Sequence, residues 1–269
     1  MKFIKYFISF SPLILFFLIS CSTVPITGRR QLNLVSTPSM LSMSSQQYNE
    51  FLKKHNISDN QKQSNMVKKV GKSIQKAVEQ YFFQKNMSHE LKNYNWEFNL
   101  VESQEANAWC MTGGKVVVYS GILTFTEDEA GLAVVMGHEI AHAVAKHGNE
   151  RMSHGLITQM GGVALFTAIN NKPEQTKQLW MTAFGLGAQF GVILPYSRVH
   201  ENEADHLGLI FMSMAGYNPN RAVSFWVKMA KKGGNKPPEF LSTHPSDENR
   251  IMNIKALMPE AMSYYKKSE

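Results

Sequence analysis

Apolar residues recur at intervals of three and four positions along much of the chain, a spacing that places side chains on one face of a helix. The recurrence predicts helices over residues 37–55 and 58–85, and a third between Asn218 and Gly233. Alternation of apolar and polar residues predicts a strand over residues 95–102. The pattern therefore favours a helix-rich α+β domain with one small β-sheet.

A β-hairpin is predicted near the middle of the chain. The β-branched and aromatic residues Val116 to Tyr119 favour a strand, and the Gly113–Gly114 pair favours a tight turn before it. An exposed sheet edge can bind an extended peptide through main-chain hydrogen bonds, so the hairpin is a candidate substrate-binding edge. A purely structural hairpin is the alternative interpretation.

The segment after the hairpin has its own helix signals. Thr126 and Glu129 have the spacing of a capping box, in which two side chains cap the first turn. Apolar residues then follow at helical spacing, namely Leu132, Val135, Met136, Ile140, Ala143 and Val144. This stripe predicts a helix whose apolar face lies in the core.

The predicted helix carries the pattern H-E-x-x-H, formed by His138, Glu139 and His142. Residues four apart project from one helix face, so both imidazoles can bind one Zn²⁺. Glu139 lies about 100° round the helix from His138, where its carboxylate can accept a proton from an attacking water. Two core histidines without a metal are the alternative, but polar groups in an apolar stripe are costly unless they are paired or bound to metal.

A catalytic zinc site needs a third protein ligand, and the nearby histidines lack the spacing for it. His147 lies about 180° round a continuous helix from His138, so we expect His147 and His154 on an exposed polar face. A later predicted helix carries Glu201 and Asp205 four residues apart on one face. This pair suits a carboxylate ligand and a second carboxylate that orients a zinc-bound imidazole. A solvated acidic face is the alternative.

Together these motifs resemble a known family. The H-E-x-x-H run and the segment S-R-x-x-E-x-E-A-D at residues 197–205 are similar to the gluzincin zinc metallopeptidases that include the CAAX prenyl protease, HtpX, BepA and LoiP. Residues 107–123 resemble the hairpin of that family, Thr243 to Pro245 with Arg250 resemble its T-H-P…R element, and residues 24–32 resemble the opening of its lipoprotein members. Thr112 departs from the family, because many relatives carry proline there.

The resemblance implies a zincin-like metallopeptidase fold with the small sheet beside the zinc-binding helix. It implies one Zn²⁺ per chain, with His138, His142 and Glu201 as its ligands. Glu139 would be the general base, and the Asp205 carboxylate would orient a zinc-bound imidazole without binding the metal itself.

The resemblance also assigns roles outside the two motifs. His244 would either stabilise the oxyanion of the reaction or occupy the zinc's open position in a resting state, and a histidine that precedes a helix start at Pro245 is a third interpretation. Asn107 and Ala108 would bind the substrate near the scissile bond. Arg250, taken without the resemblance, would be interpreted as a surface charge.

The amino terminus has the sequence of a targeting signal. Lys2 and Lys5 precede an apolar run over residues 7–19, which has about the length of a signal-peptide core. Residues 18–21 resemble a lipobox, so we expect a lipid on Cys21. An uncleaved anchor helix is the alternative, although the run is short for a span of about 20 residues.

This interpretation sets the expected domain plan and location. Residues 1–20 would be a removed signal peptide, residues 21–36 a lipidated tether and residues 37–269 a single metallopeptidase domain. Ser22, rather than aspartate, follows Cys21. By analogy with lipoprotein sorting, this predicts a lipid-anchored protein on the periplasmic face of the outer membrane of a Gram-negative bacterium.

Charge and cysteine content limit the other possibilities. The formal net charge is +7, and it falls to +5 when the two lysines of residues 1–20 are removed. The lysines are scattered without a basic stripe, so we expect no nucleic acid partner. Of the two cysteines, Cys110 has no disulfide partner once Cys21 carries lipid. We expect Cys110 to be buried beside the hairpin, with a regulatory thiol as the alternative.

Residues 155–194 are apolar and rich in glycine, and Asn170 to Pro173 divide them into two halves. Each half is short for crossing a bilayer, and small residues allow close helix packing. We therefore expect a buried helix pair. A hydrophobic surface that docks on lipid or on an outer-membrane barrel is the alternative.

These inferences predict a zinc-dependent endopeptidase of the bacterial cell envelope that hydrolyses misfolded or unfolded envelope proteins in protein quality control. Its other expected partners are outer-membrane lipid, through Cys21, and the β-barrel assembly machinery. The alternative function is a chaperone or assembly factor for outer-membrane proteins with latent or minor protease activity. An intact Glu139 favours the enzyme, because a pure binding module does not need a general base.

Overall fold

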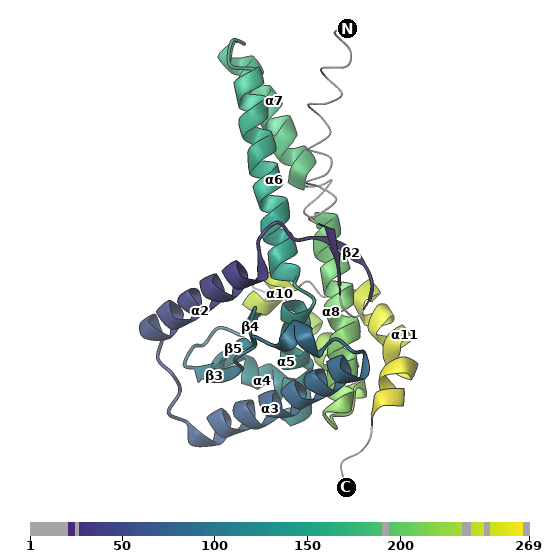
Figure 1. Ribbon diagram of the computed structural model, residues 1–269. Helices are drawn as coiled ribbons and strands as arrows, with labels where there is room; N and C mark the ends of the chain where they lie inside the picture. The colour runs from purple at the N-terminus through teal and green to yellow at the C-terminus, as the bar shows by residue number, and fades with distance from the viewer. Residues whose placement is uncertain (1–20, 25–26, 190–193, 233–237, 245–247, 266–269) are drawn as a thin grey trace. The chain divides into compact units, whose positions relative to one another are not determined.

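The computed structural model describes residues 21–24, 27–189, 194–232, 238–244 and 248–265 (Figure 1). The chain divides into two compact units, one of residues 1–39 and 146–197 and the other of residues 40–145 and 198–269. The single domain expected over residues 37–269 stays a prediction. The expected signal peptide, residues 1–20, lies outside the described residues.

Helices form most of the second unit, and the predicted fold class is confirmed. Their bounds are Thr37–Lys54 (α2), Gln61–Gln84 (α3), Leu123–Thr126 (α4), Glu129–Val144 (α5), Leu194–Met214 (α8), Asn220–Lys232 (α9), Glu239–Thr243 (α10) and Glu248–Tyr264 (α11), with 3-10 turns at Ser88–Leu91 and Ser120–Ile122. Helices α2 and α8 begin among residues of the first unit. Helix α3 starts later than predicted because the side chain of Asn60 caps it by accepting a hydrogen bond from the Gln63 amide.

A three-stranded sheet lies beside α5 in the second unit (Figure 1). Its strands are Glu97–Val101 (β3), Ala108–Met111 (β4) and Lys115–Tyr119 (β5), in the order β3-β5-β4. Strand β5 is buried along its whole length. It pairs parallel with β3 and antiparallel with β4. The turn between β4 and β5 uses Gly113 and Gly114 at φ +92° and +81°, a conformation that favours glycine. Strand β4 therefore forms one edge of this sheet.

Helix α5 is buried on every side. Each residue from Gly131 to Val144 is buried, because α3, α4, α9 and β4 all pack against this helix. Its N-cap is Asp128, whose carboxylate accepts a hydrogen bond of 2.7 Å from the Gly131 amide. The expected capping box was wrong, because Thr126 ends the preceding helix α4. Apart from its H-E-x-x-H residues the buried part of this helix is apolar or small on every side, which fits such a central position.

The first unit combines two short strands with a pair of helices. The strands Cys21–Thr23 (β1) and Arg30–Leu32 (β2) pair antiparallel, and the helices are His147–Ala168 (α6) and Glu174–Ala188 (α7). Arg29 donates hydrogen bonds of 3.0 and 2.7 Å to the buried carboxylate of Glu150. The Leu34 amide donates a further bond to the Ser153 hydroxyl. These contacts attach the segment after β1 to the first turns of α6.

Two expectations about the first unit were wrong. Helix α7 contains no buried residue, and the buried residues of α6 all lie between His147 and Ser153, so the helix pair is not buried. His147, expected to be exposed, is fully buried. The expectation assumed one continuous helix, but α5 ends at Val144 and Lys146 has φ +60°, so His147 begins a new helix. Among the described helices, none has the length and apolar character required to cross a membrane.

Candidate metal centre

Two helices cross closely at the candidate site. Gly137 of α5 faces Gly208 of α8, and a Cβ on Gly208 would lie only 2.9 Å from the backbone nitrogen of His138. No larger residue fits there without movement of one helix. The crossing brings the α8 carboxylates of Glu201 and Asp205 against His138.

The predicted ligand residues lie together. The Nε2 atoms of His138 and His142 are 3.0 Å apart, and the Glu201 carboxylate lies 3.2 Å from the first and 3.3 Å from the second. All three side chains are buried or nearly so. Two imidazole nitrogens and a carboxylate oxygen form a donor set that suits Zn²⁺. A cation between them would also offset the cost of burying their polar atoms.

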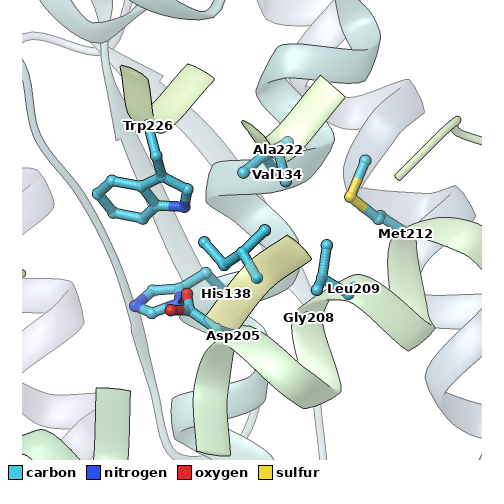
Figure 2. Close-up of a pocket in the computed structure, with 9 residues that line it drawn as sticks. Val134, His138, Asp205, Gly208, Leu209, Met212, Ala222 and Trp226 are labelled. Carbon is cyan, nitrogen blue, oxygen red and sulfur yellow. Dashed lines mark ion pairs between the residues drawn. The ribbon is translucent and has the colours of Figure 1, made fainter. Parts of the chain in front are cut away.

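The orientation of His138 is set by its second nitrogen. Its Nδ1 lies 2.9 Å from Asp205, which assigns the Nδ1–H tautomer and leaves Nε2 to face the cluster. Figure 2 shows the His138 ring beside the Asp205 carboxylate, at a small cavity that Trp226 and several aliphatic side chains also line. This apolar lining keeps bulk water away from the imidazole–carboxylate contact.

Burial and charge act in opposite directions on the pKa values of the site. Burial disfavours a charged His138, but hydrogen bonds with Asp205 and Glu201 outweigh it and raise the pKa of this imidazole to about 9. Burial alone would raise the pKa of the Glu201 carboxyl, but hydrogen bonds from the neighbouring imidazoles hold it well below its usual range. The pKa of Asp205 is also lowered despite burial, chiefly by the charge of Arg250. The carboxylates therefore stay ionised.

Arg250 of α11 lies at the site, although sequence reasoning gave it no role there. Its guanidinium donates hydrogen bonds of 2.8 and 2.7 Å to the two oxygens of Asp205, lies 3.5 Å from the centre of the Trp226 ring and is 3.3 Å from Glu201. The residue is 5% exposed, so its interpretation as a surface charge was wrong. The T-H-P…R resemblance was the only sequence signal for it.

His244 is placed inside the cluster. Its Nδ1 atom lies 2.9 Å from Glu201 and 3.1 Å from His138 Nε2, and its Nε2 atom lies 3.4 Å from Glu139. The ligand atoms of His138, His142, Glu201 and His244 all lie within 4.8 Å of one another. Residue 245, where a helix start was expected, lies outside the described residues. Position alone fits both chemical roles that the resemblance implied for His244.

Asn107 and Ala108 lie at the start of β4 and outside the cluster. Ala108 pairs with Val118 of β5, and the Asn107 side chain accepts a hydrogen bond from the Ala108 amide. The neighbouring Ala106 carbonyl accepts a hydrogen bond of 3.0 Å from the Phe240 amide at the start of α10. Strand β4 packs against α5. His244 lies directly after the last residue of α10. The start of β4 is thus connected to the segment that positions His244.

Cys110 lies in β4, within the hairpin, and is partly exposed, so the expectation of a buried cysteine was wrong. The surrounding protein nevertheless desolvates the thiol and raises its pKa well above the ordinary value, and the charge of Glu139 adds to this effect. A neutral thiol is a poor nucleophile, so its surroundings do not favour a reactive regulatory cysteine.

Comparison with known families defines the class of protein. Residues 68–258 match Peptidase family M48. The chain therefore belongs to this family, and the prediction of a metallopeptidase is confirmed.

Individual relatives refine the comparison. The mitochondrial metalloendopeptidase OMA1 of Schizosaccharomyces pombe is 38% identical over 173 residues, 64% of this chain and 49% of that protein. The protein of the same name from Saccharomyces cerevisiae is 30% identical over 269 residues, 95% of this chain and 74% of that protein. The beta-barrel assembly-enhancing protease of Yersinia pestis is 30% identical over 166 residues, 60% of this chain and 34% of that protein. This chain thus matches about half of the first relative and a third of the last.

These relatives overturn the predicted location. The similar proteins from two yeasts, Arabidopsis thaliana, Bos taurus and Homo sapiens are all mitochondrial metalloendopeptidases. The expectation of a lipid-anchored protein on a bacterial outer membrane was therefore wrong. It rested on residues 1–22, and a short basic segment followed by an apolar run indicates targeting in general more strongly than one compartment.

Proposed function

We propose that this protein is a zinc-dependent endopeptidase that hydrolyses unfolded or misfolded proteins in protein quality control. The observation that carries the proposal is the convergence of His138, His142 and Glu201, with Glu139 beside them on α5. In this proposal the two imidazoles and the carboxylate hold one Zn²⁺ per chain. Three protein ligands are the usual number at a catalytic zinc site, because one position stays open for reactants.

The chain's own groups then have distinct tasks. Bound zinc would supply a Lewis acid that polarises the substrate carbonyl and acidifies the attacking water. Glu139 would accept the proton of that water and deliver it to the leaving amine. Asp205 would hold the His138 ring through its Nδ1–H, and Arg250 would hold Asp205. Burial of the whole set excludes bulk water and strengthens these interactions.

The sheet edge supports the proposed substrate class. Strand β4 is an edge strand of the described sheet and packs against the metal-binding helix. A peptide that pairs with an edge strand must be extended, and main-chain hydrogen bonds make little use of its side chains. Asn107 and Ala108 would lie near the scissile bond. Such binding suits unfolded segments of many sequences.

His244 carries two opposite proposals that one substitution separates. As a resting-state ligand it would block the open position, and its contacts of 2.9 and 3.1 Å with Glu201 and His138 support this role. As an oxyanion donor it would stabilise the transition state. His244→Ala should raise basal proteolysis in the first case. Loss of activity with unchanged zinc content would instead favour the second.

The second candidate function is an assembly factor or chaperone with latent protease activity. The similarity to beta-barrel assembly-enhancing proteases and the position of His244 within the cluster favour it. Its partner would be a β-barrel protein or the machinery that assembles it. A Glu139→Gln variant separates the candidates, because it should abolish cleavage and keep any assembly activity.

The decisive experiment measures cleavage of an unfolded protein such as casein by the zinc-loaded full chain and by Glu139→Gln. We expect the variant to lose at least about a thousandfold in rate while it keeps its zinc and its melting temperature. Glu90→Gln, which changes a carboxylate far from α5 in the sequence, serves as the matched control. Equal cleavage by the wild type and Glu139→Gln would contradict the proposed mechanism.

A further inference from the structure

The hairpin of α6 and α7, over residues 155–188, concentrates the exposed apolar surface of the protein. Among the described residues, seven of the thirteen large exposed apolar side chains belong to it: Leu156, Met160, Val163, Phe166, Leu179, Trp180 and Leu186. Met160 is 70% exposed and Leu179 is 69% exposed. Large apolar side chains that are concentrated and exposed in this way mark a candidate interaction site, because burying them against a partner removes apolar area from water.

These side chains are not used to hold the hairpin together. The two helices, which run side by side in Figure 1, pack through Phe184 of α7 against Gly161 and Gly162 of α6. A Cβ on Gly161 would lie 3.1 Å from the Phe184 ring. Met160 and Val163 are three apart and share a different face of α6. The exposed residues therefore remain available for another surface.

The charge pattern indicates what kind of surface that is. The sequence contains no charged residue from 155 to 171, and none from 178 to 189. Protein interfaces surround their apolar centre with a polar rim, whereas a hydrocarbon environment accepts apolar side chains on several faces and rejects charge. Trp180 adds an aromatic ring with a polar N–H, which suits the boundary between acyl chains and headgroups.

The sequence joins a second apolar segment to the same unit. The apolar run of residues 7–19 precedes β1. The chain that follows β1 is attached to α6 by the Arg29–Glu150 pair and the bond from Leu34 to Ser153. The two apolar segments are thus linked through the described chain between them. A lipid bilayer would cover both.

We propose that the α6–α7 hairpin docks on a lipid bilayer, with Met160 and Val163 of α6 and Leu179 and Trp180 of α7 inserted among the acyl chains of one leaflet. This binding is driven by burial of apolar area, so it does not need anionic lipid. It is also independent of the metal centre, which belongs to the other compact unit.

Trp180 provides a local test in the full chain. Vesicles of pure phosphatidylcholine with brominated acyl chains should quench its fluorescence, whereas unbrominated vesicles should not. Trp180→Phe keeps an apolar ring at this position, so it should still float with the vesicles but lose most of the quenching. Because the signal comes from the hairpin itself, vesicle binding through residues 7–19 alone cannot produce it. Absence of bromine quenching at Trp180 would overturn the proposal.

A charged variant tests the same face by partition. Met160→Glu combined with Val163→Glu should lower partition into the vesicles and bromine quenching by about tenfold or more, because each exposed position loses apolar burial and gains a charge. Phe83→Glu is the matched control, since Phe83 is 74% exposed on α3 in the other unit and should leave both readouts unchanged. Circular dichroism and zinc content check that each variant is folded. Wild-type bromine quenching in the double variant would overturn the proposal. So would lipid-free self-association that the double variant abolishes, because it would assign the face to a second copy of the chain.

Discussion

His138 makes a different contact with each ring nitrogen. Its Nε2 atom faces the ligand cluster, and its Nδ1 atom lies 2.9 Å from Asp205, which is in turn bound by Arg250. The polar contacts therefore run inward from a cation on α11 to a candidate ligand on α5. Each member is buried, so removal of any one leaves another without its partner in a region of low dielectric.

Zinc binding should release protons from this network. The pKa of His138 without metal is about 9, and an imidazole binds metal only in its neutral form. Protons therefore compete with zinc below pH 9, and the apparent zinc affinity should rise as the pH rises towards this value. At pH 7 binding should release about one proton from His138. Titration calorimetry in two buffers of different ionisation enthalpy measures the release. A value near zero at pH 7 would contradict the assignment.

Arg250 should contribute to both stability and metal affinity. Arg250→Met leaves Asp205 buried without its cation, which should destabilise the fold by about 3–5 kcal/mol. It should also weaken zinc binding by about 10–100-fold, because the carboxylate that orients His138 loses its support. Arg250→Lys keeps the charge without the paired hydrogen bonds. Its stability and its zinc affinity should lie between those of the wild type and those of Arg250→Met.

Urea denaturation and competition with a zinc chelator measure the two effects. Arg151→Met, at an exposed position of α6, is the control and should change stability by no more than about 0.5 kcal/mol. Equal zinc affinity in Arg250→Met and the wild type would remove Arg250 from the supporting network.

Local spacing explains which site residues could be predicted. His138, Glu139 and His142 lie within one turn and a half, so helix periodicity alone brings them to one place. Arg250 lies more than a hundred residues away, and its burial depends on how α11 packs beside α9 and α8. Its neighbours in sequence are polar, which indicated a surface position. A single sequence contains no physical signal that outweighs this indication.

At the scale of elements, the crossing of α5 and α8 decides whether the site forms. Gly208→Ala would place a methyl group 2.9 Å from the backbone nitrogen of His138, so one helix must move. We expect a loss of roughly 1–3 kcal/mol in stability and a measurable fall in zinc affinity. Gly155→Ala in α6 is the matched control, because nothing lies within 4 Å of the added methyl group.

The control should be neutral or stabilising by up to about 1 kcal/mol, since alanine favours helix. Thermal unfolding in the presence of a chelator measures the stability of each variant, and a zinc titration measures its zinc affinity. If Gly208→Ala matched Gly155→Ala in both, close helix approach would have no part in forming the site.

Most helices and strands could be predicted from periodicity, whereas their surroundings could not. The expected elements at residues 37–55, 58–85 and 95–102 are present with small shifts at their ends. The wrong predictions concerned burial, because one sequence pattern can occur in a buried helix and in an exposed helix. An apolar glycine-rich pair favours burial, yet α7 is exposed. Helical spacing placed His147 opposite His138, yet a single left-handed residue, Lys146, separates their helices.

At the scale of the whole molecule, the two compact units should respond differently to metal. A ligand that binds only the folded state stabilises it by an amount that grows with ligand concentration, about 4 kcal/mol at a thousand times Kd. The candidate ligands all belong to the second unit. Zinc should therefore slow hydrogen exchange in residues 129–144 and 198–214 and leave exchange in α7, residues 174–188, unchanged.

Hydrogen exchange with mass spectrometry, with zinc and with chelator, tests this prediction. A Glu201→Gln variant should show no zinc-dependent protection in either unit, because it lacks one proposed ligand. Equal protection of α7 and α5 by zinc in the wild type would show that the units unfold together.

The order of the site residues along the chain has a consequence for synthesis. His138 and His142 emerge from the ribosome first, Glu201 follows only after the whole of α6 and α7, and His244 and Arg250 follow after α8 and α9. A nascent chain that stops before α8 has the two imidazoles but lacks Glu201, the third proposed ligand. With the proposed ligand set, the zinc site therefore cannot form before α8 has been synthesised.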